Sequence, residues 1–164
     1  MGAGSGVHRA AVKGTYLLIL HLERELADWQ VGRLGRFTFA PGYYLYVGSA
    51  FGSGGLAARL AHHERRHKPR PHWHIDYLRA QAALVEAWAV ASLAPLERCW
   101  AGALATAPGL AMPARGFGAS DSQLASHLLY SRRMPARQPL IEALLGCAEL
   151  AGAPRLTIDI RTYS

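Results

Sequence analysis

The chain is poor in cysteine and in acidic residues, and it lacks long apolar runs. Its two cysteines, Cys99 and Cys147, lie in apolar, helix-like surroundings rather than in a C-x-x-C spacing, so we expect no disulfide framework and a reducing cytoplasm. The apolar stretches at residues 16–22 and 84–93 fall well short of the roughly twenty residues that span a membrane. The glycine-rich first thirteen residues lack the apolar core of an export signal. These absences predict a soluble protein with no membrane partner.

The small number of acids leaves the protein strongly basic. Eighteen Lys and Arg against eleven Asp and Glu give a formal charge of +7 and a pI near 9.9. Basic residues and histidines concentrate between residues 59 and 79, which predicts a basic face for a polyanion. We expect five of these residues to contact DNA: Arg66, Lys68, Arg70, His72 and His74. A solvated helix end is the alternative, and charge alone does not separate nucleic acid from a membrane surface.

The length and composition suit one packed core, since the chain has 164 residues of which 51% are apolar. Apolar, branched and aromatic residues predict strands at residues 13–22, 43–49 and 84–91, although the alanines of residues 84–91 also permit a helix. The glycines of residues 23–41 predict a hairpin-type excursion between the first two strands. Three helices and two short strands complete the expected elements: helices at 55–67, 95–106 and 139–150, and strands at 128–131 and 155–160.

The helix predicted at residues 55–67 carries the most specific polar pattern. Ser53 is its expected N-cap, and the Lys68-Pro69 pair ends it. Three residues form the expected inner stripe: Leu56, Leu60 and Ala61. Four residues at i, i+3, i+4 and i+7 spacing are expected on one polar face: Arg59, His62, His63 and Arg66.

Some of these side chains suit the hydrolysis of a phosphodiester. That reaction needs a positive group on the phosphate, a group that activates or orients water, and usually a divalent cation. Arg59 can hold the phosphate, Glu97 can anchor Mg²⁺ or Mn²⁺, and Tyr16, Tyr46 or His63 can handle the proton. Because a free tyrosine titrates near pH 10, Tyr16 needs nearby cationic charge to act as a base at neutral pH.

Several ordered blocks carry a resemblance to a known family. The chain resembles the GIY-YIG nuclease superfamily, whose two tripeptides correspond here to Gly14-Thr15-Tyr16 and Tyr46-Val47-Gly48. Within it, the chain is most similar to a small, largely uncharacterised subgroup found alone or fused to DNA-repair glycosylases. Further blocks support this at residues 41–50, 55–63, 72–78, 96–97, 116–121 and 126–130. The resemblance covers about residues 13–131.

The resemblance implies a single α/β domain with a three-stranded antiparallel sheet flanked by helices, and one metal ion. Residues 1–12 are then a flexible segment, 13–131 the nuclease-like domain, and 132–164 a helix and tail packed on it. Each catalytic role falls on one residue. Tyr16 is implied as general base or water-orienting group, Tyr46 as its support, Arg59 as the phosphate contact, His63 as a contact to phosphate or water, and Glu97 as the metal ligand.

Two departures from the family pattern are present. The excursion at residues 23–41 is longer than in typical members, so it shapes or blocks a substrate surface. Ser122 and Leu124 stand where the subgroup commonly has cysteines, so the loop at residues 121–127 has no clear metal or redox role. Asp76 and Asp121 either supply a second carboxylate or hold basic partners in place, and the role of His127 is left open.

Each site residue also has a purely structural interpretation. The two tyrosines could fill a core, Arg59 could lie on a solvated face, and Glu97 could complement a helix dipole. Zinc is not expected, because no cysteine or acidic partner completes a specific spacing with the histidines.

The sequence therefore predicts a metal-dependent DNA endonuclease, with a role in DNA repair and no small-molecule cofactor. One alternative is a non-catalytic nucleic-acid-binding module that uses the same basic face, and a weaker one is a protein-interaction domain. The sequence does not decide DNA against RNA, or monomer against dimer.

Overall fold

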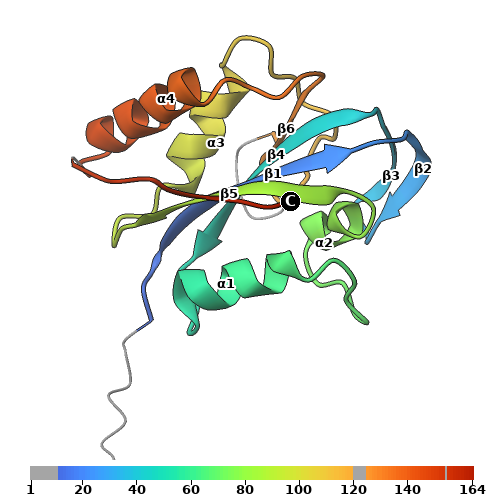
Figure 1. The fold of residues 1–164 in the computed structure, drawn as a ribbon, viewed down its shortest axis with the longest axis horizontal. Coiled ribbons are helices and arrows are strands. Elements are labelled where there is room, and N and C mark those ends of the chain that lie inside the picture. Colours follow the sequence, from blue (N-terminus) through green and yellow to red (C-terminus); the bar gives the residue numbers. More distant parts are fainter. Residues whose placement is uncertain (1–10, 120–124, 154) are drawn as a thin grey trace, which may run out of the picture.

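A five-stranded antiparallel sheet is the centre of the computed structural model, which describes residues 11–119, 125–153 and 155–164 (Figure 1). The strand order is β6-β4-β1-β5-β7. The bounds are β1 (Gly14–Leu22), β4 (Gly42–Ala50), β5 (Ala83–Ala91), β6 (Leu128–Ser131) and β7 (Asp159–Thr162). The expectation of a three-stranded sheet is wrong in its count, because β6 and β7 extend the three central strands at both edges. The broader expectation of an α/β fold is confirmed.

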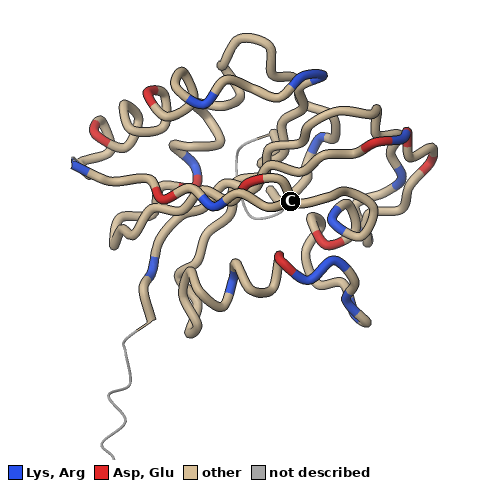
Figure 2. Tube along the Cα trace, in the orientation of Figure 1, with Lys and Arg blue, Asp and Glu red and all other residues tan. Residues whose placement is uncertain are grey.

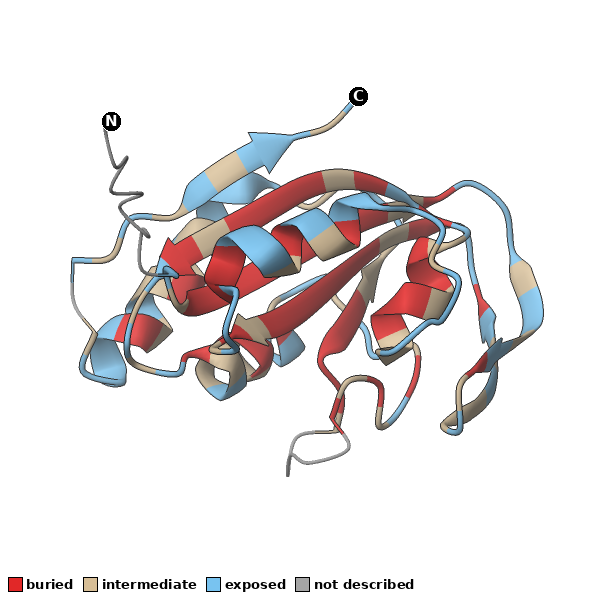
Figure 3. Cartoon of the chain, turned by 90° about the horizontal axis from the view of Figure 1, so that it is seen from below, coloured by how far each residue is buried: buried red, intermediate tan, exposed pale blue. Residues whose placement is uncertain are grey.

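The central strand β1 is buried on both of its faces. Its side chains alternate, so that Tyr16 and Leu18 pack with one apolar cluster while Leu17 and Ile19 pack with another. Figure 1 shows α1 and α2 on one side of the sheet, and α3 and α4 on the other. In Figure 3 the central strands are red along most of their length, whereas the outer helix surfaces are pale blue. This two-sided burial explains why the sequence of β1 is apolar almost without interruption.

The segment between β1 and β4 forms the predicted hairpin. It pairs β2 (Leu26–Val31) with β3 (Gly35–Phe39) in a separate two-stranded sheet. The hairpin packs against α2 (His74–Arg79), where the indole N–H of Trp29 donates to the Tyr77 carbonyl at 3.0 Å. The six-residue α2 was not predicted, because so short a helix has little periodicity to detect.

Helix α1 (Gly55–Glu64) differs from its prediction in three ways. The helix begins at Gly55, whose φ of +61° favours glycine. Gly54 occupies the N-cap position, and the Ser53 side chain makes no cap. The helix ends at Glu64, where the guanidinium of Arg79 donates to the His63 and Glu64 carbonyls, which have no partner within the helix. Ala61 is exposed, whereas His63 is fully buried. His63 therefore belongs to the core side of the helix, not to its solvated face.

Helices α3 (Glu97–Ala105) and α4 (Arg137–Leu150) cover the opposite face of the sheet. A disulfide joins Cys99 on α3 to Cys147 on α4, so the expectation of no disulfide is wrong. The two cysteines are 48 residues apart in sequence, and only the packing of α3 against α4 brings their Cα atoms to 5.9 Å. In the described part of the chain, none of the helices has the length and apolar character needed to cross a bilayer.

Candidate active site

The two tripeptides meet on adjacent strands. Tyr16 of β1 lies opposite Gly48 of β4, and Leu18 lies opposite Tyr46, so both tyrosines are on the α1 side of the sheet. A Cβ atom on residue 48 would lie 2.2 Å from the Cζ and Oη atoms of Tyr16. The glycine of the second tripeptide thus leaves the space that the tyrosine ring of the first one fills.

Tyr16 forms a buried pair with His63 of α1. The Tyr16 hydroxyl lies 2.8 Å from Nε2 of His63, and the two residues are 2% and 0% exposed. Burial, reinforced by His62, lowers the pKa of His63 to about 3. The imidazole is therefore neutral at neutral pH. Its Nδ1 has no hydrogen-bond partner among the described residues.

The environment of Tyr16 disfavours its phenolate form. Burial and the neighbouring Tyr46 raise the pKa of Tyr16 well above its ordinary value, and the opposing effect of Arg59 is smaller. The charge of Arg59 alone therefore does not offset the effect of burial on the pKa of Tyr16. A protonated tyrosine can still donate a hydrogen bond and orient water, which is the second of its two predicted roles.

Arg59 lines an open hollow beside the start of α1. Its guanidinium carbon is 4.2 Å from the ring centroid of Trp73, a cation–π contact that fixes the side chain. The hollow has a volume of about 500 Å³ and is also lined by Gly52, Ser53 and Arg65. The guanidinium is therefore held on an aromatic surface next to a glycine-rich loop, where it can reach an anionic group.

Glu97 is the first residue of α3, and its side chain is 31% exposed. Its Oε1 lies 2.8 Å from Nδ1 of His127, the residue that precedes β6. The approach lacks hydrogen-bond geometry, and neither ring nitrogen of His127 has a hydrogen-bond partner within the described ranges. Sequence reasoning did not connect His127 with Glu97, because the two meet only through the fold.

The predicted catalytic residues come from β1, β4, α1 and α3, and His63 packs against both tyrosines of the set. The rings of Tyr46 and His63 are 6.4 Å apart. Burial raises the pKa of Tyr46, the charge of Glu97 raises it further, and Arg59 opposes both. Glu97 and Arg59 act on the pKa of Tyr16 in the same opposite senses. The charges of Arg59 and Glu97 therefore both act on the tyrosine pair.

Gly118 lies close to the side chains of both Tyr46 and His127. This glycine has a φ of +67°, and a Cβ atom there would lie 2.9 Å from Cε2 of Tyr46 and 3.3 Å from Cβ of His127. Its backbone N–H donates to Nδ1 of His74 at 2.8 Å. The small residue thus lets the 116–118 turn run between the two side chains.

The five predicted DNA contacts fall into two groups. Arg70 and His72 are exposed in the segment between α1 and α2, where Figure 2 shows basic residues gathering. The other three make internal contacts: Arg66 with the Ala80 and Gln81 carbonyls, Lys68 with Asp76, and His74 with Gly118. Binding of DNA by all five stays a prediction, but three of them also hold the local fold together.

Asp76 supplies the acidic partner that sequence reasoning did not find for the histidines. One ligand atom each from His62, His63 and Asp76 lies within 4.8 Å of the others, as a metal site would require. The carboxylate is already engaged, however. Its Oδ2 accepts from the backbone N–H groups of His72 and Trp73, and its Oδ1 lies 2.9 Å from His62 and 3.3 Å from the Lys68 ammonium.

These bonds decide the charge of Asp76. Burial alone would raise its pKa, but the Trp73 and His72 amides, His62 and Lys68 together hold the pKa below its usual value. The ionised carboxylate thus already has a buried cation in Lys68. We therefore assign it to anchoring α2 and the preceding basic segment.

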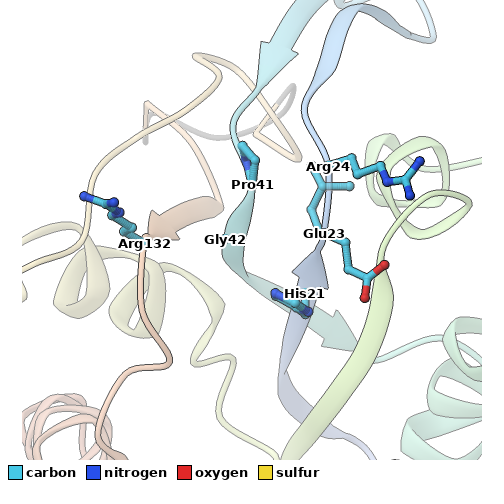
Figure 4. Close-up of a pocket in the computed structure, with 7 residues that line it drawn as sticks. His21, Glu23, Arg24, Pro41, Gly42 and Arg132 are labelled. Atoms are coloured by element: carbon cyan, nitrogen blue, oxygen red, sulfur yellow. The ribbon is translucent and has the colours of Figure 1, made fainter.

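A second hollow of about 530 Å³ lies away from this chemistry (Figure 4). It is lined by residues from the end of β1, the start of β4 and the segment after β6: His21, Leu22, Glu23, Arg24, Pro41, Gly42 and Arg132. None of the predicted site residues contributes to it.

The fold is an α/β domain in which two strand tyrosines pack against a buried histidine, and the charges of an arginine and a glutamate act on both tyrosines. A family model described as "Domain of unknown function DUF123" matches residues 15–148, and the chain belongs to this family. No curated protein matches the chain, and no solved structure matches it either.

Proposed function

We propose that this protein is a metal-dependent endonuclease of the GIY-YIG type that hydrolyses phosphodiester bonds in DNA. The observation that supports this most is the packing of His63 against Tyr16 and Tyr46, with the charges of Arg59 and Glu97 acting on both tyrosines. A core aromatic pair alone would not need a buried neutral histidine on one hydroxyl, with an arginine and a glutamate within electrostatic range.

In this proposal Arg59 binds the scissile phosphate. Its guanidinium is planar and stays charged, so two of its N–H groups can contact two non-bridging oxygens and stabilise the charge that develops there. The Trp73 ring beneath it limits its motion. The arginine is therefore ordered before the substrate arrives, which reduces the entropy lost on binding.

Tyr16 and His63 orient the attacking water. Because the pKa of Tyr16 is raised by burial and that of His63 is lowered to about 3, both groups are neutral and share one hydrogen bond. A fixed hydroxyl can position water for in-line attack on phosphorus, with the O3′ or O5′ oxygen leaving on the opposite side. Tyr46 packs beside His63 and supports its position.

Glu97 is the residue that would hold Mg²⁺ or Mn²⁺. Its carboxylate is partly exposed and lies beside a buried imidazole whose nitrogens have no hydrogen-bond partner in the described part of the chain, a donor set that fits a divalent ion. Such an ion, when bound, lowers the pKa of a coordinated water and stabilises the leaving oxygen.

The resemblance to proteins fused to DNA-repair glycosylases favours a role in DNA repair, and a DNA substrate favours the cytoplasm. The cysteines no longer support that location, because Cys99 and Cys147 are paired. The location therefore depends on the substrate alone.

Cleavage of labelled duplex, single-stranded, flapped and branched DNAs, with Mg²⁺ or Mn²⁺, tests this function. We expect metal-dependent nicking that falls at least about 100-fold in Glu97→Gln and in Arg59→Ala. Glu142→Gln, an exposed carboxylate on α4, is the matched control and should retain activity. Absence of cleavage of every substrate with either metal would contradict the proposal.

A non-catalytic nucleic-acid-binding module is the second candidate, favoured by the exposed Arg70 and His72 and the charge of +7. It predicts salt-dependent DNA binding that Glu97→Gln leaves unchanged, without cleavage.

A further inference from the structure

We infer that His127 joins Glu97 as a protein ligand of the metal centre, and that this mixed nitrogen and oxygen site prefers Mn²⁺ to Mg²⁺. This inference rests on the proposed function only for the existence of a metal at Glu97. It adds a ligand and a metal preference that the two tripeptides and their partners do not imply.

The geometry of the pair fits shared coordination better than a hydrogen bond. Nδ1 of His127 and Oε1 of Glu97 are 2.8 Å apart, yet the angle does not suit an N–H donor. Two ligands at about 2.1 Å from an ion, in adjacent octahedral positions, lie about 3.0 Å apart. The observed separation is close to that value, so both atoms can reach one ion with small adjustments.

The burial of His127 also requires a partner. The residue is 2% exposed, and both of its ring nitrogens lack hydrogen-bond partners among the residues that the structure describes. A buried polar group without a partner destabilises a fold, so such groups are usually satisfied by a ligand, a water or an ion. An ion shared with Glu97 would satisfy Nδ1.

The backbone around His127 fixes the imidazole in this position. The His127 N–H donates to the Phe117 carbonyl at 2.8 Å, and the His127 carbonyl accepts from Val47 of β4 at 3.0 Å. A Cβ atom on residue 118 would lie 3.3 Å from Cβ of His127, so the glycine lets the backbone of the turn pass close to this side chain. The side chain is therefore held beside Glu97 by the sheet and the 116–118 turn, as a preorganised ligand is.

The His62, His63 and Asp76 cluster is the competing location for a metal. There the Lys68 ammonium already lies 3.3 Å from the carboxylate, and its charge would repel a divalent ion. No ammonium or guanidinium group lies within ion-pair distance of Glu97 in the described ranges. The Glu97–His127 pair is therefore the better site.

The donor set predicts the metal preference. Mg²⁺ favours oxygen ligands and keeps several waters, whereas imidazole nitrogen binds more readily to transition metals. One carboxylate and one imidazole leave further positions for water and the DNA phosphate. We therefore expect the His127 nitrogen to strengthen binding of Mn²⁺ and to add little to that of Mg²⁺.

Electron spin echo envelope modulation of Mn²⁺ bound to the full-length protein tests the ligand directly. We expect ¹⁴N modulation from one coordinated imidazole, replaced by ¹⁵N modulation when the wild-type protein is labelled with ¹⁵N-histidine. The signal should vanish in His127→Gln and persist in His62→Gln. The labelled wild type keeps the test valid even if a variant misfolds.

The outcomes separate this inference from the proposed function. Mn²⁺ bound without nitrogen modulation would overturn the inference even if the protein cleaves DNA. Loss of the signal in His62→Gln but not in His127→Gln would overturn it by placing the ion at Asp76. A titration should show Mn²⁺ binding weakened at least about tenfold in His127→Gln, and Mg²⁺ binding weakened less than about threefold. An imidazole signal without any DNA cleavage would support the ligand assignment and count against the nuclease.

Discussion

The two faces of the sheet bury polar groups in different ways. On the α3 and α4 face, the buried carboxylate of Glu86 accepts from the Trp88 indole at 2.7 Å and from Arg137 at 3.0 Å. On the α1 and α2 face, His63 keeps one ring nitrogen without a partner among the described residues, and burial lowers its pKa to about 3.

This difference separates scaffold from site. The α3 and α4 face is mainly aliphatic, and the Cys99–Cys147 disulfide joins its two helices. The buried Glu86 carboxylate on this face has hydrogen-bond donors, whereas the Trp100 indole N–H has no partner among the described residues. The α1 and α2 face holds buried titratable groups, Tyr16 and His63, whose pKa values are shifted far from their ordinary values. Such shifts are typical of functional sites. The comparison predicts that changes on the first face affect mostly stability and changes on the second mostly activity.

The largest expected effect on stability comes from the disulfide. Replacing Cys99 and Cys147 by alanine should lower the free energy of unfolding by about 4 kcal/mol, because the cross-link closes a loop of 48 residues in the unfolded chain. Urea unfolding of the oxidised wild type and of the double variant measures this. The reduced wild type serves as the control and should match the variant. A loss under about 1 kcal/mol would show that helix packing alone stabilises this face.

Two neighbouring residues of β1 provide the sharpest contrast between the faces. Leu17→Ala should lower the free energy of unfolding by about 3 kcal/mol, since it leaves a cavity in the α3 and α4 face. Tyr16→Phe should lower it by only about 1 kcal/mol, through the lost hydrogen bond to His63, yet reduce DNA cleavage at least about 100-fold.

Urea unfolding and nicking assays on both variants, at a temperature where each is folded, make the comparison. Equal losses of activity in Leu17→Ala and Tyr16→Phe would remove the distinction between scaffold and site.

An effect smaller than that of the disulfide or of Leu17→Ala is a pH dependence of stability that originates in His63. Its pKa is about 3 in the folded protein and near 6.5 when unfolded, so between these values the unfolded state binds the extra proton. Stability should therefore be full above pH 6.5 and fall as the pH drops, by about 2 kcal/mol at pH 5. Urea unfolding from pH 8 to pH 4 measures it. His63→Gln should remove this component, whereas the exposed His67→Gln should keep it.

The sequence predicts the central strands well, because β1, β4 and β5 are mostly apolar and contain branched and aromatic residues. It misplaces His63, since helical spacing puts this residue with Arg59 and His62. Only the buried hydroxyl of Tyr16, contributed by another element, explains why a histidine turns inward.

Tertiary pairing accounts for the remaining differences. The disulfide between Cys99 and Cys147, the contact of His62 with Asp76 and the approach of His127 to Glu97 each join segments that are distant or separated by a loop. No local pattern encodes such distances. Trp73 lies in the block at residues 72–78, but its contact with Arg59 does not follow from spacing.

The Tyr16 ring packs over Gly48, so the two tripeptides depend on each other although they are distant in sequence. The phenol ring fits only because residue 48 on the adjacent strand has no side chain, and this contact requires a glycine at position 48 only while the tyrosine is present. Neither half can therefore be redesigned alone, so an engineer who wished to move this chemistry to another sheet would have to transplant the strand pair together with its register.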